Sequence, residues 1–232
     1  MASTSVPVTT LPRPALMRQW MAQYHVPAVG IGLVNGNRIT SKVYGELSKG
    51  IPAPQNTVWS SGALAGAIAM VNNMEDDKID KKVRSNDLFA ELHMPDTAFG
   101  DPIKVLNRMA RPHNKRDGIY VFKPYHTDKH LFTTVNDYCK LLAHINNQPD
   151  VVAGLTTVNE AIEDSSNWRL VNGAWGDQGG IIHCGAGNGS SHVILLLPQS
   201  KQAMVIFTNS DNGKMIGQHI LNECGIDIIS IV

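Results

Sequence analysis

Short apolar runs near both ends of the chain have the length and composition of β-strands. At the N-terminal end, residues 28–34 (AVGIGLV) and 39–44 (ITSKVY) flank an Asn-Gly-Asn sequence at 35–37. Asn-Gly between two such runs is a strong signal for a hairpin. Three further strand-like runs follow near the C-terminal end: residues 180–184, 192–197 and 204–208.

Helical periodicity marks four other segments. In residues 134–146 (TVNDYCKLLAHIN) the apolar side chains fall on one face, Thr134 suits the N-cap and Asp137 occupies the third helical position. The Ala-rich segment 63–73 also predicts a helix, which Gly66 weakens. The remaining two predicted helices span residues 16–24 and 213–223.

Strands at both ends with helices between them predict an α+β fold. We expect one antiparallel sheet built from both chain ends, flanked by the N- and C-terminal helices and carrying a helical insert. Residues 1–13, rich in Ser, Thr and Pro, are expected to form a flexible arm. Residues 14–232 then form a single domain, with its sheet region at 14–59 and 150–232 and its insert at 60–149.

Composition excludes several classes of protein. The 232 residues carry 20 Lys+Arg against 20 Asp+Glu, a net charge of +0, which argues against a nucleic-acid partner. No apolar run reaches the roughly 18 residues that a membrane helix needs, so no membrane partner is expected. The N-terminus shows no secretory signal, and the three cysteines form no CxxC pair. These features predict a soluble, cytoplasmic protein without a disulfide framework.

Four segments, in order, resemble the superfamily of serine β-lactamases, penicillin-binding-protein-like proteins and class C esterases. They are VPAVGIGLVNGNRITSKVYG (opening hairpin), NTVWSSGALAGAIAMV (Thr-x-Phe and nucleophile helix), HLFTTVNDYCKLLAHI (Ser/Thr-x-x-Asp helix) and HCGAGNGSSHVILLLPQSKQAMVIFTNSDNG (third active-site element and last two strands). The resemblance implies a β-lactamase/transpeptidase-like fold. It also implies a reduced helical insert, with much of the family's lobe deleted between Asp80 and Phe99.

The sequence departs from this family at the catalytic motif. The family's Ser-x-x-Lys places a lysine amine beside the serine hydroxyl, whose proton it accepts. Counting from Thr57-x-Trp59 puts Ala63 and Gly66 at these two positions, and starting instead at Ser60 or Ser61 finds no lysine either. We therefore expect the ordinary acyl-enzyme route to be lost.

The third element survives as His183-Cys184-Gly185. In the family this strand lies along the cleft, so the resemblance implies that His183 faces the substrate and that the Ala186 N–H helps to form an oxyanion hole. Imidazoles and backbone donors can move protons and polarise carbonyl groups without a nucleophile. The plainer interpretation of His183 is a solvent-facing histidine on a strand.

The other candidates surround this element. Tyr125 and His126, in the titratable run 123–130, are candidate partners of His183, with a solvated connection as the alternative. Trp175 is a candidate pocket wall or a core residue. His126, Asp128 and His130 share a face if the chain is extended, but no fourth ligand is evident, so no metal or other cofactor is expected. The expected substrate-binding residues are Trp59, Ser60, Ser61, Trp175, Ala186 and Asn209, although residues at the position of Asn209 more often fix the turn before the last helix and one serine suits a helix N-cap.

Three functions remain open. The leading hypothesis is an enzyme that transforms a small, carbonyl-containing molecule by non-covalent acid–base chemistry, as an isomerase, cyclase or lyase, with His183 as the catalytic residue. The second is a serine hydrolase or acyltransferase that uses Ser60 or Ser61. The third is a non-catalytic ligand-binding pseudoenzyme. A shortened lobe leaves apolar surface less covered, which favours a homodimer.

Overall fold

Two antiparallel sheets form the framework of the protein. The computed structural model describes residues 10–61, 81–100, 103–116, 118–120, 130–157, 168–171 and 179–223. Among these residues, the larger sheet has seven strands in the order β3-β2-β1-β11-β10-β9-β7. Their bounds are β1 Ala28–Asn35, β2 Arg38–Ser48, β3 Ile51–Pro52, β7 Arg169–Val171, β9 Gly180–Gly187, β10 Ser190–Leu197 and β11 Gln202–Thr208.

Pairing between β1 and β11 joins the two chain ends in the middle of this sheet. The register runs from Val29 opposite Thr208 to Asn35 opposite Gln202. On the outer side of each of these two strands lies the strand next to it in the chain: β2 beside β1, and β10 beside β11. The predicted sheet built from both chain ends is therefore confirmed, and so is the α+β fold.

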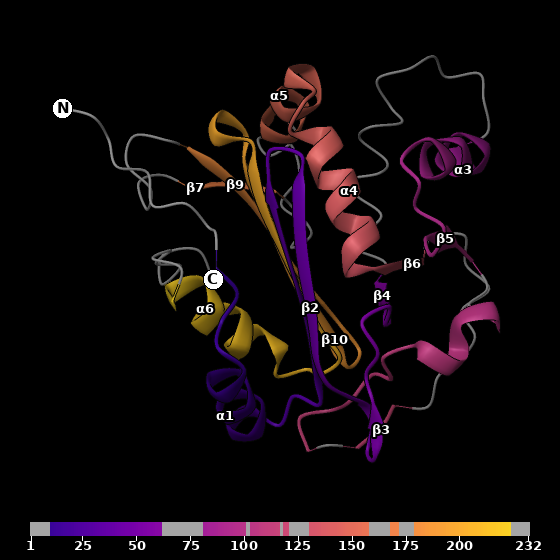
Figure 1. Cartoon of the computed structure of the whole chain (residues 1–232), viewed down its shortest axis with the longest axis vertical. Coiled ribbons are helices and arrows are strands. Elements are labelled where there is room, and N and C mark those ends of the chain that lie inside the picture. Colours follow the sequence, from indigo (N-terminus) through magenta and orange to yellow (C-terminus); the bar gives the residue numbers. More distant parts are fainter. Residues whose placement is uncertain are drawn as a thin grey trace.

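Helices α1 (Pro14–Tyr24) and α6 (Gly213–Glu223) cover one face of the sheet (Figure 1). Their apolar sides pack on inward-facing residues of the central strands, such as Ile31 and Ile206. The Tyr24 hydroxyl lies 2.7 Å from Nε2 of His219, which ties the two helices together. The predicted helix at 213–223 is confirmed, and the one predicted at 16–24 begins two residues earlier, at Pro14, a residue that suits the first helical turn.

Residues 11 and 12, which the sequence assigns to a flexible arm, lie against the domain. Leu11 packs on the cluster beneath α1 and α6. The Tyr44 hydroxyl donates a 3.1 Å hydrogen bond to the carbonyl oxygen of Pro12, which is buried. The ordered domain therefore begins before residue 14.

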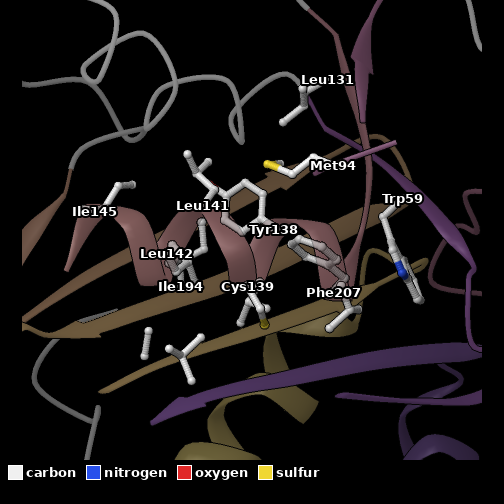
Figure 2. Packing of buried hydrophobic residues seen from close by; sticks show 14 of the residues in the cluster. Trp59, Met94, Leu131, Tyr138, Cys139, Leu141, Leu142, Ile145, Ile194 and Phe207 are labelled. Carbon is white, nitrogen blue, oxygen red and sulfur yellow. The ribbon is translucent and has the colours of Figure 1, made fainter. Parts of the chain in front are cut away.

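Helix α4 (Val135–Ile145) covers the opposite face. The Thr134 side chain accepts a 3.1 Å hydrogen bond from the Asp137 N–H, so the predicted N-cap is confirmed. Figure 2 shows Tyr138, Cys139 and Leu142 of this helix directed at the sheet, near Phe207 and Ile194. These side chains belong to the largest buried cluster of the protein's described residues.

Two glycines of β1 permit the close approach of α4. A Cβ atom on Gly32 would lie 2.3 Å from Sγ of Cys139, and one on Gly30 would lie 2.5 Å from Cγ2 of Val135. Real Cβ atoms do not pack this closely, so any side chain at either position would push the helix away from the strand.

The smaller sheet has the order β4-β6-β5, with β4 at Val58–Ser61, β5 at Ala98–Phe99 and β6 at Leu131–Thr134. Ser60, one of the two serines considered for a helix N-cap, pairs with Phe132 inside this sheet and is a strand residue. The predicted helix at 63–73 lies outside the described residues. The described residues also include three further helical segments: α3 (Lys81–Glu91), the 3₁₀ helix η1 (Ile103–Arg108) and α5 (Pro149–Thr157).

Two of these helices modify the predicted domain plan. Helix α3 lies in the segment where the resemblance implies a deletion, so part of the insert is retained there. Helix α5 lies in the predicted sheet region, where the sequence offered no strand pattern. In the part of the chain that the structure describes, no helix is both long and apolar enough to cross a lipid bilayer.

Candidate functional site

His183 lies near the edge of the large sheet, on the face covered by α4. Residues 181 and 194 on this face belong to the cluster beneath α4, and His183 pairs with Ile194. Strand β7 pairs only with residues 180–182 of β9, so beyond Ile182 that side of β9 has no partner strand among the described residues. The His183 side chain is 2% exposed, which excludes the solvent-facing interpretation.

A second histidine contacts His183 from the neighbouring strand. Nε2 of His192 lies 3.2 Å from Nδ1 of His183, within hydrogen-bonding distance. The two ring centroids are 5.2 Å apart and the ring planes differ by 9°. His192 pairs with Gly185, which has no side chain, so the imidazole has room to lean diagonally toward His183.

Three further aromatic side chains extend this pair across the sheet. Pairing of Arg169 with Ile182 brings the preceding residue, Trp168, opposite His183, and their ring centroids lie 5.0 Å apart. On the other side, His192 pairs with Phe207 of β11. The Phe207 ring lies 6.0 Å from Trp59, whose indole covers Gly30 of β1. We call this set the aromatic row: Trp168, His183, His192, Phe207 and Trp59.

Burial keeps the His192 imidazole neutral at physiological pH. Desolvation, followed by the repulsion of a charge on His183, lowers the pKa of His192 to about 3. At neutral pH the His192 ring therefore carries a single proton, and one of its two nitrogens donates while the other accepts. A neutral imidazole can donate a hydrogen bond to a carbonyl oxygen or accept a proton, depending on which nitrogen carries the hydrogen.

The lowered pKa of His192 makes stability depend on pH. In the unfolded chain a histidine titrates near 6.5, so between this pH and about 3 the unfolded state binds a proton that the folded state does not. The free energy of unfolding should therefore fall as the pH falls below about 6.5, by up to about 1.4 kcal/mol per pH unit from this residue. Chemical denaturation at pH 7, 5 and 4 measures this, with His192→Phe as the comparison. If the wild type and His192→Phe lose the same unfolding free energy between pH 7 and pH 4, the pH dependence does not come from His192.

Comparison with solved structures identifies the architecture. A β-lactamase from Sulfitobacter sp. EE-36 superimposes with a TM-score of 0.65 at 13% identity, over 90% of this chain and 95% of that one. A penicillin-binding protein homologue from Pyrococcus abyssi gives 0.68 at 11% identity, over 92% and 77% of the two chains. The fold is that of the serine β-lactamases and penicillin-binding proteins. SurE also superimposes, with a TM-score of 0.68 at 13% identity over 92% of this chain and 75% of that one.

The likeness lies in the fold rather than in the sequence. No protein-family model matches the chain, and no curated protein sequence is significantly similar to it. The β-lactamase-like fold that the sequence resemblance implies is nevertheless confirmed by these structures.

Two residues expected to bind substrate are built into this β-lactamase-like scaffold. Trp59 is buried in the aromatic row, and its Nε1 atom has no hydrogen-bond partner in the part of the chain that the structure describes. Asn209 is 1% exposed, and its Oδ1 accepts a 2.7 Å hydrogen bond from the Ala28 N–H. Its Nδ2 donates to the carbonyl oxygens of Arg111 at 3.0 Å and Leu47 at 3.4 Å. Asn209 thus joins three chain segments.

The remaining expected site residues occupy varied positions. Ala186 is exposed on β9, and Ser60 is half-buried on β4. Tyr125, His126 and Trp175 lie outside the described residues, as does the side chain of Ser61. Of the hypothetical metal ligands, His126 and Asp128 also lie outside. Among the residues described, no three His, Cys, Asp or Glu side chains converge as a metal site.

Sequence reasoning missed His192 and Trp168. A usable signal for His192 was Asn188-Gly189, a two-residue turn between β9 and β10 that fixes their register. That register places residues 183 and 192 on one face as diagonal neighbours. The position of Trp168 had no such signal, because eight residues separate β7 from β9 in the sequence, too many for a two-residue turn to fix their register.

Proposed function

We propose that this protein transforms a small, carbonyl-containing organic molecule by non-covalent acid–base chemistry, as an isomerase, cyclase or lyase, and that His183 is its catalytic residue. The observation that carries the proposal is the hydrogen-bonded pair of His183 and His192 on the α4 face, beside the side of β9 that has no partner strand among the described residues. Tyr125 and His126 remain the proposed partners of His183.

The chemistry of the ring supports this role. Nδ1 of His183 is engaged by His192, so exchange of a proton with a substrate would use Nε2. The surrounding aromatic row provides low-polarity surroundings, in which a hydrogen bond to a developing oxyanion is stronger than in water. Without Ser-x-x-Lys in the sequence, the proposal requires no covalent intermediate.

Burial of the pair favours a second candidate, a ligand-binding protein without catalysis. His183 and His192 are 2% and 4% exposed, so a substrate reaches His183 only after the side chains over the ring move. If the two histidines only pack against the sheet, no such movement is needed. In this candidate the ligand leaves the protein chemically unchanged.

One experiment separates these two functions. Small carbonyl compounds are screened by thermal shift, and each stabilising compound is incubated with the protein and analysed by mass spectrometry and NMR. The proposal expects a changed product, formed about 10²-fold or more slowly by His183→Ala. A stabilising compound that is recovered unchanged supports the second candidate, and turnover that His183→Ala leaves intact excludes His183 as the catalytic residue.

A separate experiment tests serine acyl chemistry. Intact-mass spectrometry after incubation with a fluorophosphonate, and separately with a β-lactam, should show no adduct, because the sequence lacks a lysine three residues after either serine. Ser60→Ala/Ser61→Ala is the control. An adduct that this double variant abolishes would overturn the proposal in favour of a hydrolase or acyltransferase.

A further inference from the structure

We infer that His192 is a positioning residue that holds the imidazole of His183 in a single tautomer and orientation. The inference rests on the proposed function of His183 and deepens it. It concerns which ring nitrogen of His183 carries the proton, and this choice decides what the ring can do to a substrate.

The geometry couples the two rings through one proton. Nε2 of His192 and Nδ1 of His183 are 3.2 Å apart, and a difference of 9° between the ring planes aligns the two groups. One of the two nitrogens must donate while the other accepts. The direction of this hydrogen bond therefore links the tautomer of one ring to the tautomer of the other.

Packing holds the pair in this arrangement. Trp168 lies against His183 on the side opposite His192, and Phe207 pairs with His192 across β11. Both histidines are buried, so rotation of either ring would break a hydrogen bond in low-dielectric surroundings. His192 remains neutral down to acidic pH, so it orients His183 without taking a positive charge from it.

Each direction of the hydrogen bond gives a defined chemistry. If Nε2 of His192 donates, the proton of a neutral His183 resides on its own Nε2, which can then donate to a substrate carbonyl oxygen. If Nδ1 of His183 donates, its Nε2 is a proton acceptor and His183 is a general base. In either case His192 selects one of these roles and excludes the other.

The test reads the tautomer directly by ¹⁵N NMR of the histidine side chains, without a substrate. The ¹⁵N signals of His183 are those that disappear in His183→Gln. We expect one of them to have the shift of a protonated nitrogen and the other that of an unprotonated nitrogen. A scalar coupling should also connect Nδ1 of His183 to Nε2 of His192 across the hydrogen bond. Absence of that coupling in the folded wild type would overturn the inference without relying on any variant.

Two substitutions of His192 separate positioning from packing. His192→Phe preserves ring packing but removes the hydrogen bond, so the two ¹⁵N shifts of His183 should move toward a tautomeric average. His192→Gln can donate or accept, and it should restore two distinct shifts. Two distinct shifts in His192→Phe would show that His192 only packs. These NMR measurements need no turnover, so they are independent of the activity test of His183→Ala. Turnover that His183→Ala leaves intact would remove the proposed function without changing the NMR result.

Discussion

Gly32→Ala is expected to lower the free energy of unfolding by about 3 kcal/mol, as overpacking of a dense core does. The added Cβ would lie 2.3 Å from Sγ of Cys139, 2.7 Å from Cγ1 of Val135 and 3.0 Å from Cγ1 of Val205. All three neighbours are buried, so α4 must move away from β1 to accommodate the methyl group. Urea denaturation followed by circular dichroism measures the change in unfolding free energy.

Two further variants serve as controls for this prediction. Gly187→Ala, on the exposed end of β9, places a Cβ 3.7 Å from Oγ of Ser190 and should cost far less. The double variant Gly32→Ala/Cys139→Ala removes the closest contact. Its loss of unfolding free energy should therefore be smaller than the sum of the losses in the two single variants. Equal stability of Gly32→Ala and Gly187→Ala would contradict the packing of α4 on β1.

Asn209→Ala is expected to destabilise the fold by roughly 3–5 kcal/mol, at about 1–3 kcal/mol for each buried group left unsatisfied. The Ala28 N–H loses its acceptor and the Arg111 carbonyl oxygen loses its side-chain donor, whereas the Leu47 carbonyl oxygen keeps the hydrogen bond from the Arg111 N–H at 3.0 Å. These groups belong to segments far apart in the chain, and water cannot easily replace the amide because Asn209 is buried. Thermal and urea unfolding of purified protein measure this loss.

Asn147→Ala is the matched control. Its Nδ2 donates a single 2.9 Å hydrogen bond to the Ala143 carbonyl oxygen at an exposed position, so its removal should have little effect. If Asn209→Ala unfolds like the wild type yet weakens ligand binding, Asn209 is the substrate-binding residue that the sequence resemblance implies. A large loss of stability instead assigns Asn209 to the framework.

Local patterns in the sequence were sufficient for most elements around the site. The Asn-Gly turn after Val34 predicts the β1–β2 hairpin, and Thr134 with Asp137 predicts the start of α4, because turns and caps are made by residues close together in the chain. The small sheet was not predicted. Its strands β4 and β6 are about 70 residues apart in sequence, and β5 has two residues, too few for a periodic signal.

The sequence by itself determined the fold class, the pairing of the two chain ends in one sheet and the absence of a Ser-x-x-Lys motif. These depend on short-range periodicity, turn residues and residue identity. Only the tertiary structure decided that Trp168 and His192 contact His183, that Asn209 joins three segments and that Gly32 lies against Cys139. Such contacts depend on strand register and on the distance between a helix and a sheet, which are set when distant side chains pack together.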